Sequence, residues 1–261
     1  MEHTECTRQG LSAQAIRAQL KKRDIPLFLF DSISSTSDAA REYAAAHPGE
    51  GAVFIAESQT AGRGRRGRSF SSPAGSGVYM SLLVYPRHAA SEGVLLTTGA
   101  AVAMCRAIRR VTGLSPAIKW VNDLMLGGKK LCGILTEGQI DTARDRFSYA
   151  VIGVGINVRS VPAEVSGIAT ALDLHTNAPT DRNRLAAEMI REILKSLDEP
   201  RDAQMEAYRA RCPIAGRTVT VLRGEERDCA HVIKILEDGS LLVEKNGEEA
   251  VLSSGEISIR E

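Results

Sequence analysis

Two kinds of apolar pattern divide the chain at about residue 211. Before that point, short continuous apolar runs alternate with longer segments in which apolar residues recur every three or four positions. The first kind is typical of buried strands and the second of amphipathic helices. The pattern predicts strands at 27–30, 53–56, 78–84, 118–121, 124–126, 131–137 and 149–158, and helices at 11–24, 38–46, 92–110 and 184–197. We therefore expect an α/β domain.

Beyond residue 211 the pattern changes to short β-type runs at 218–222, 231–236, 241–244, 250–252 and 257–260. Turn signals separate several of them, at Arg223-Gly224, Asp238-Gly239 and Asn246-Gly247. Such spacing predicts a small all-β module that forms a barrel. The expected organisation is a short N-terminal helical segment (1–25), an α/β domain (26–211) and a C-terminal β domain (212–261).

Composition excludes several classes of protein. The 33 basic and 32 acidic residues leave a net charge of +1, which provides no overall field for nucleic acid. No apolar run is long enough to span a membrane, and residues 1–10 lack a signal-peptide core. The five cysteines are odd in number and contain no Cys-x-x-Cys pair, which argues against a disulfide framework or a zinc site. We expect a cytoplasmic protein with no membrane association.

One short segment stands out against this neutral background. Residues 62–68, here called the arginine loop, read Gly-Arg-Gly-Arg-Arg-Gly-Arg. Glycine allows close backbone approach, and arginine presents paired donors that match phosphate or carboxylate oxygens. The loop is predicted to bind an anion and to become ordered when the anion neutralises it. The alternative is an ordinary solvated basic turn.

The glycines of the loop also fit G-x-G-x-x-G, but the context opposes the usual meanings of that motif. A dinucleotide-binding fold needs a helix to begin here, and residues 68–73 are a poor helix start. A kinase needs H-R-D and D-F-G motifs downstream, and neither occurs. The chain also lacks H-E-x-x-H, G-x-S-x-G and P-loop motifs, so metal hydrolysis and triad catalysis are not expected.

Four further windows place polar groups beside predicted strands. They are the hydroxyl-rich turn at 35–37, K-W-V-N-D at 119–123, K-L-C-G-I-L-T-E at 130–137 and G-V-G-I-N-V at 153–158. Ligands of α/β sheets collect at strand ends, and small residues in a strand let a ligand or another backbone approach. Each window also has an ordinary structural interpretation, such as a turn or a surface lysine.

Taken in order, these windows and the arginine loop resemble the biotin protein ligases, also called biotin–[acetyl-CoA-carboxylase] ligases. The resemblance runs from about residue 28 to the S-G-E-I-S-I-R segment at the C-terminus. It implies a mixed-sheet catalytic domain like that of class II aminoacyl-tRNA synthetases, with a C-terminal SH3-like barrel. It also implies a two-step ligase, in which biotin and ATP give biotinyl-5′-AMP and the biotinyl group then passes to a carrier lysine.

The resemblance assigns roles to individual residues. Lys130 and Arg63 are the expected catalytic residues, and Asp123 is the expected partner of Mg²⁺. Residues 159–172 correspond to a second loop that closes over adenine. The expected biotin-binding residues are Ser35, Thr36, Ser37, Gln59, Arg63, Gly64, Arg65 and Lys130. The expected ATP- or adenylate-binding residues are Gly62, Arg65, Arg66, Lys119, Asn122, Asp123 and Asn157.

The chain departs from the family pattern at Ser37, Phe70 and Val121, where asparagine, tryptophan and proline are common.

About 25 residues precede the matching region, too few for a winged helix-turn-helix, so we expect a monofunctional ligase without DNA binding. The expected partner is the biotin carboxyl carrier protein of acetyl-CoA carboxylase or of a related biotin-dependent carboxylase. Two alternatives stay open: a lipoate or octanoate ligase or transferase of the same fold, and a nucleic-acid-binding regulator.

Overall fold

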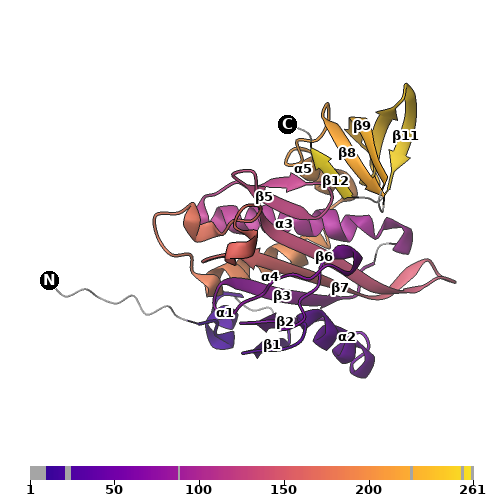
Figure 1. Cartoon of the computed structure of the whole chain (residues 1–261). Helices are drawn as coiled ribbons and strands as arrows, with labels where there is room; N and C mark the ends of the chain where they lie inside the picture. The colour runs from indigo at the N-terminus through magenta and orange to yellow at the C-terminus, as the bar shows by residue number, and fades with distance from the viewer. Residues whose placement is uncertain (1–9, 21–24, 88, 224–225, 254–255, 260–261) are drawn as a thin grey trace.

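The computed structural model describes residues 10–20, 25–87, 89–223, 226–253 and 256–259 (Figure 1). Parts of the sequence predictions lie outside the described residues. They are the first nine residues with Cys6, the end of the first predicted helix at 21–24, Gly224 of a predicted turn, and residues 254, 255 and 260 of the C-terminal motif.

A seven-stranded mixed sheet forms the body of the molecule. Its spatial order is β1 (Leu27–Phe30), β2 (Ala52–Ala56), β3 (Gly77–Val84), β7 (Arg146–Asn157), β6 (Lys129–Asp141), β5 (Asp123–Leu126) and β4 (Ala117–Lys119). Only the β1–β2 pair is parallel, and the other neighbours are antiparallel. The prediction of an α/β fold with a mixed sheet is therefore confirmed.

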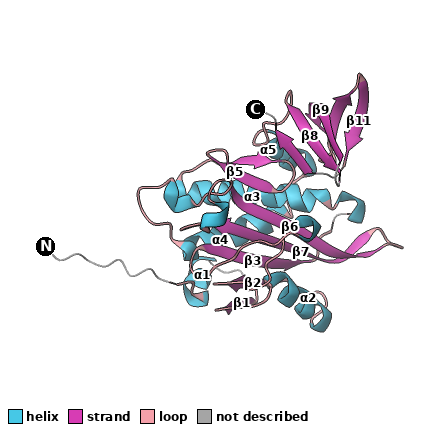
Figure 2. Ribbon diagram, in the orientation of Figure 1, coloured by secondary structure: helices cyan, strands magenta, loops and turns pink. Residues whose placement is uncertain are grey.

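Helices cover both faces of this sheet (Figures 1 and 2). Helix α2 (Thr36–Ala46) packs on one face, over Phe54, Leu83 and Val151. The opposite face carries the larger apolar core and the helices α1 (Ala13–Leu20), α3 (Val94–Thr112) and α4 (Arg182–Ser196), with α5 (Arg201–Arg209) against α3. In the described part of the chain, no helix is both long enough and apolar enough to cross a membrane.

The alternation of residues along β7 explains where the sheet is left uncovered. Ile152, Val154 and Ile156 point to the larger core, so Gly153 and Gly155 point to the α2 face. Gly133 in β6 lies opposite Gly155 and shares its face. Because glycine has no side chain, this face has an open area beyond the first turn of α2.

The C-terminal part forms a separate five-stranded antiparallel sheet. Its order is β11 (Glu248–Leu252), β10 (Leu241–Lys245), β9 (Glu226–Ile235), β8 (Thr218–Arg223) and β12 (Glu256–Ile259). Figure 1 shows it at one end of the molecule, beyond α5. Within the described residues β11 and β12 are its edge strands. The β9–β10 turn contacts the main body, because a Cβ on Gly239 would lie 2.5 Å from Val94 Cγ1.

Several elements differ from the sequence predictions. The strand predicted at 231–236 begins five residues earlier, at Glu226, and the strand predicted at 131–137 extends to Asp141. The strand predicted at 118–121 ends at Lys119, because Lys119 pairs with Asp123 and residues 120–122 form the turn between them. Helix α5 was not predicted. It is polar along most of its length, and its buried residues, Gln204, Met205 and Tyr208, pack on the rest of the protein through long-range contacts.

Candidate active site

A pocket of about 160 Å³ lies over the glycine-lined face of the sheet. It brings together residues from seven separate segments of the chain. Of the residues predicted from the sequence, those that line it are Ser35, Thr36, Ser37, Gln59, Arg63, Gly64, Arg65, Arg66, Lys119, Asn122, Asp123 and Lys130. The segments lie far apart in sequence, so the sheet topology is what gathers them.

Buried hydroxyl and amide groups form one wall. Ser35 caps α2 by accepting a hydrogen bond from the Ser37 amide at 3.3 Å. The next residue, Thr36, donates from its backbone N–H to Gln59 Oε1 at 2.9 Å. Both the Thr36 and Ser37 hydroxyls contact Ser81 Oγ, at 2.8 and 3.0 Å. These groups satisfy one another, which fixes their directions before any ligand arrives.

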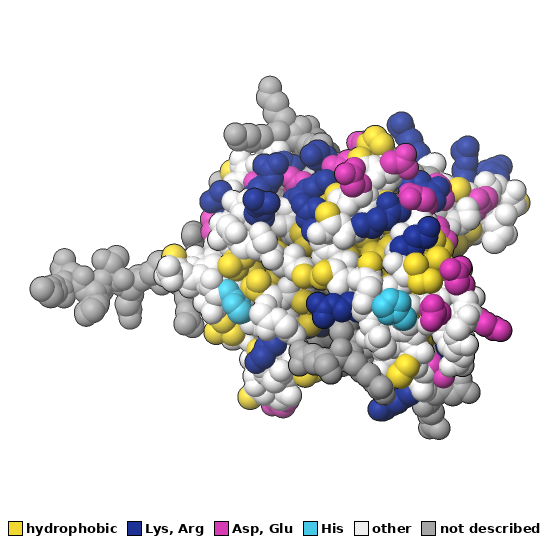
Figure 3. Space-filling view, turned by 90° about the horizontal axis from the view of Figure 1, so that it is seen from above, with side chains coloured by type: hydrophobic (Ala, Val, Ile, Leu, Met, Phe, Trp, Pro, Cys, Tyr) yellow, Lys and Arg dark blue, Asp and Glu magenta, His cyan; other side chains and the backbone are white. Residues whose placement is uncertain are grey.

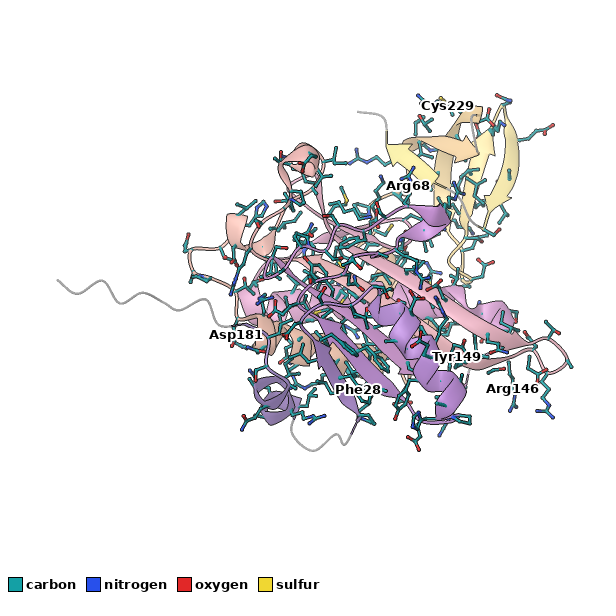
Figure 4. All side chains as sticks on the ribbon, turned by 60° about the horizontal axis from the view of Figure 1, so that its bottom comes forward. Phe28, Arg68, Arg146, Tyr149, Asp181 and Cys229 are labelled. Atoms are coloured by element: carbon teal, nitrogen blue, oxygen red, sulfur yellow. The ribbon has the colours of Figure 1, made fainter. Side chains whose placement is uncertain are left out.

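The arginine loop forms a cationic rim of the pocket and folds back on itself. Gly64 N–H donates to Arg68 O at 2.7 Å, and Phe70 N–H donates to Gly62 O at 2.8 Å. Arg66 has φ 57° in a short 3₁₀ turn at the tip, the left-handed region that non-glycine residues rarely adopt. In Figure 4, Tyr149 and Arg146 lie toward the projecting end of the β6–β7 hairpin, away from the label of Arg68.

Side chains tie the loop to its surroundings, and the contacts of Arg65 and Arg63 lie at the pocket. Arg65 Nη1 donates to Asn122 Oδ1 at 3.0 Å, which links the loop to the 119–123 turn. Arg63 Nη2 lies 3.0 Å from Asp38 Oδ1 and 3.5 Å from Glu137 Oε2. Arg41 pairs with the same two carboxylates. The ion pairs of Arg63 are about one third exposed, so a ligand anion can exchange with them at small cost.

Lys130 is held both at its ammonium group and at its backbone. Its Nζ lies 2.8 Å from Asp123 Oδ1, and its side chain is 38% exposed. Its N–H donates to Ile168 O at 2.9 Å, and its C=O accepts from Thr170 N–H at 2.8 Å. Lys130 is thus a partly buried, ion-paired residue of the pocket rather than a free surface lysine.

Two predicted site residues lie outside the pocket lining. Asn157 Nδ2 donates to Thr170 O at 3.1 Å, which anchors the segment that also holds the Lys130 backbone. Gly62 packs within its own hairpin, where a Cβ would lie 2.5 Å from Phe70 O. Asn157 thus holds the segment that contacts the Lys130 backbone, and Gly62 packs within the hairpin of the arginine loop.

Sequence reasoning missed several residues of the pocket. Phe70 lies over the open sheet face, since a Cβ on Gly155 would lie 2.4 Å from its Cε1. Ser81 is fully buried and joins the hydroxyl wall. Trp120 also lines the pocket, although its indole is bonded elsewhere. A lone serine in the apolar run 78–84 was the available signal for Ser81.

The site offers polar and cationic groups but no thiol nucleophile or preformed metal centre. Burial raises the pKa of the Cys132 thiol well above its usual value, and the nearby Asp123 charge adds to this. Cys132 is therefore a neutral apolar side chain. Among the described residues, no group of three or more His, Cys, Asp or Glu side chains is placed to hold a metal ion.

The described side chains form no large surface region of one charge sign on the face drawn in Figure 3. Figure 3 shows basic and acidic side chains intermixed on the face seen from above. Four guanidinium groups, those of Arg63, Arg65, Arg66 and Arg68, line the pocket. A pocket that combines a hydroxyl wall with a cationic rim fits a ligand with a neutral polar end and an anionic end.

Comparison with known proteins agrees with this chemistry. Residues 29–157 match the Biotin/lipoate A/B protein ligase family. The chain is 34% identical over 233 residues to the biotin–[acetyl-CoA-carboxylase] ligase of Mycobacterium tuberculosis, covering 86% of this chain and 85% of that protein. The chain therefore belongs to this family, and its relatives there are biotin ligases.

Two further relatives show how far the similarity extends. The bifunctional ligase/repressor BirA of Bacillus subtilis is 40% identical over 190 residues, which are 70% of this chain and 57% of that protein. The biotin protein ligase of Aquifex aeolicus, solved in complex with biotin and ATP, has a TM-score of 0.70 and 25% identity. That match covers 90% of this chain and 98% of the Aquifex chain.

Proposed function

We propose that this chain is an ATP-dependent biotin protein ligase. In the first step, a biotin carboxylate oxygen attacks the α-phosphorus of ATP and pyrophosphate leaves, giving biotinyl-5′-AMP. In the second, the deprotonated amine of an acceptor lysine attacks the acyl carbon and AMP leaves. The observation that supports this most is the convergence of a buried hydroxyl–amide wall and an arginine rim on one pocket.

The hydroxyl–amide wall suits the ureido ring of biotin. That ring has two N–H donors and one carbonyl acceptor, and Ser35, Thr36 and Ser37 are all less than 10% exposed. With Gln59 they supply partners for those groups. The dithiolane ring of lipoate has no N–H or carbonyl group and therefore gains no hydrogen bond from these hydroxyl and amide groups. The wall therefore favours biotin over lipoate.

The cationic rim suits the joining of two anions. Two unit charges 4 Å apart near a protein surface repel by about 4 kcal/mol. Arg63, Arg65 and Lys130 all line the pocket and can offset this repulsion. We assign Arg63 and Arg65, with Gly64 between them, to the carboxylate and the α-phosphate, and Arg66, Lys119 and Asn122 to the nucleotide side.

Lys130 is the proposed catalytic cation. Its ammonium lies at the pocket beside Asp123, and its backbone is fixed by two hydrogen bonds. A fixed positive charge there stabilises the oxygen that becomes more negative as each bond forms. Asn157 and Gly62 are proposed to act on this site through the segments they hold.

The residues fit an Mg²⁺ ion that arrives with the triphosphate. Mg²⁺ is commonly held by one or two carboxylates and by substrate phosphates. Asp123 supplies one carboxylate in the pocket, and its charged partner is the ammonium of Lys130. When bound, the ion would neutralise phosphate charge, while Asp123 would share its carboxylate between the ion and Lys130.

Several finer assignments belong to the same proposal. The mixed sheet of residues 26–211 would be a class II synthetase-like catalytic domain, and residues 212–261 an SH3-like domain. The acceptor would be a biotin carboxyl carrier protein of acetyl-CoA carboxylase or a related carboxylase, in the cytoplasm. Residues 159–172 would close over adenine, supported by their contact with the Lys130 backbone.

The test is label transfer from biotin to a purified biotin carboxyl carrier protein in the presence of ATP and Mg²⁺. We expect labelled carrier that depends on ATP and on the acceptor lysine. Labelled lipoate, offered in parallel, should give no labelled product. Transfer from lipoate but not from biotin would replace this proposal by a lipoate ligase.

A further inference from the structure

The 119–123 turn carries the nucleotide side of the pocket, but residues far along the chain hold it in place. Lys119 ends β4 and Asp123 begins β5, and both line the pocket with Asn122. Between them, Trp120 and Val121 are buried, at 4% and 6% exposure. What these two residues contact therefore decides where the polar residues of the turn lie.

Each of them makes one buried hydrogen bond to the C-terminal half of the protein. Trp120 Nε1 donates to Gly239 O at 2.8 Å. The Tyr208 hydroxyl donates to Val121 O at 3.0 Å. Gly239 lies in the β9–β10 turn and Tyr208 lies in α5, and both are outside the family match at 29–157.

Both partners are themselves fixed. Tyr208 is fully buried. Gly239 has φ +80°, and its turn is closed by the hydrogen bond from Leu236 N–H to Ser240 O at 2.8 Å. A Cβ on Gly239 would lie 2.5 Å from Val94 on α3, so the turn sits directly on the main body. Because Tyr208 and Gly239 are themselves fixed, they determine the position of the 119–123 turn to which they are hydrogen-bonded.

We propose that Tyr208 and Gly239 are positioning residues that set the nucleotide side of the pocket. This inference rests on the proposed function and assigns part of it to the C-terminal half. The hydroxyl–amide wall is built from the start of α2, Gln59 after β2 and Ser81 in β3, and the hydrogen bonds among these groups involve neither Tyr208 nor Gly239. Loss of either contact should therefore affect nucleotide binding and leave biotin binding unchanged.

Tyr208→Phe is the sharpest variant, because it removes one hydroxyl and keeps the ring. Tyr79→Phe is the matched control: Tyr79 is 1% exposed, and its hydroxyl also donates to a backbone carbonyl, Pro73 O, at 3.1 Å. Tyr79 does not contact the 119–123 turn through that group. Thermal unfolding of both variants checks that each is folded.

The chain provides its own probe, because Trp120 is its single tryptophan and lines the pocket. Titrations followed by tryptophan fluorescence use biotin alone, then a non-hydrolysable ATP analogue with and without biotin. For Tyr208→Phe we expect the Kd of the analogue to rise about 5- to 10-fold, the worth of one hydrogen bond, with the Kd of biotin within 2-fold of wild type. Tyr79→Phe should leave the Kd of the analogue unchanged.

The outcomes separate this inference from the proposed function. An unchanged analogue Kd in Tyr208→Phe, or an equal rise in both Kd values, would overturn the positioning role. If the wild-type protein binds the ATP analogue but not biotin, the ligase proposal is overturned, whereas the effect of Tyr208→Phe on the Kd of the analogue can still be measured. Gly239→Ala, which forces the turn away from Val94, should reproduce the selective loss of nucleotide binding.

Discussion

The contact between Phe70 and the glycines beneath it yields a quantitative prediction. In Gly155→Ala, the new Cβ would lie 2.4 Å from Phe70 Cε1 and 2.7 Å from Cζ, where ordinary contact begins at 3.4 Å. The ring must therefore move by about 1 Å. The sheet lies directly beneath the ring, since a Cβ placed at Gly133 would also be only 3.2 Å from Phe70 Cε2. The free direction is away from the sheet, into the pocket.

The expected cost follows from known effects of overpacking. Forcing a core side chain aside costs about 1–3 kcal/mol, and replacing glycine returns about 0.4–1 kcal/mol by restricting the unfolded chain. The net destabilisation should be about 1–2 kcal/mol, which lowers Tm by roughly 2–8 °C in a protein of this size. The displaced ring also narrows the pocket, so the Kd values of biotin and nucleotide should both rise.

Thermal unfolding and ligand titration measure these effects, and two further variants make the test specific. Gly167→Ala is the matched control for thermal unfolding, because a Cβ at Gly167 meets nothing within 4 Å. In a Phe70→Ala background, Gly155→Ala should cost less than about 0.5 kcal/mol, because the clash is gone. The same cost in both backgrounds would refute the explanation.

Three other predictions concern single charges. Lys130→Ala should reduce biotin-dependent pyrophosphate release by about 10²–10³-fold, because removal of one group that stabilises a developing oxyanion usually has this effect. Lys130→Arg should recover part of the lost rate. Wild-type turnover in Lys130→Ala would reject the catalytic role of Lys130. Arg63→Ala should speed the escape of biotinyl-AMP, measured by retention on a desalting column, while changing stability by less than about 1 kcal/mol; unchanged retention would count against an anchoring role. Glu57→Ala should cost about 3–5 kcal/mol in urea unfolding, because it leaves Arg182, whose side chain is 2% exposed, without its carboxylate partner. Burial alone would raise the pKa of Glu57, but hydrogen bonds and charge from Arg182 and the Leu11 N–H lower it overall. The ionised Glu57 therefore stabilises the fold above about pH 4.3, the pKa of glutamate in the unfolded chain, and this stabilisation is lost as the pH falls through the lower pKa of the folded state. The free energy of unfolding of Glu57→Gln should thus fall less steeply with decreasing pH than that of the wild type. The same pH dependence of the unfolding free energy in both proteins would contradict this.

Local patterns predicted most of the secondary structure because they report burial directly. The strand at 27–30 has the predicted bounds, and the alternation in G-V-G-I-N-V fits a strand with one apolar and one open face. Helix α5 was missed because its burial comes from contacts with α3 and the 119–123 turn, which no short window contains.

The site was predictable as a set of motifs but not as a geometry. The arginine loop and the 119–123 turn were identified separately, yet the Arg65–Asn122 bond that joins them depends on the fold. Ser81 became visible only through the β3–β7 register, which places it beside Gly153 and under Thr36. Asn157 was assigned to the ATP side from its motif, whereas its amide bonds to Thr170.

The central claim is that one pocket holds a carboxylate and a nucleotide between the hydroxyl wall and the arginine loop. A crystal structure with biotin and a non-hydrolysable ATP analogue tests it most directly. We predict the ureido ring against Thr36 and Gln59, and both anionic groups in contact with Arg63, Arg65 or Lys130. Ligands bound elsewhere, with the arginine loop contacting neither, would contradict it.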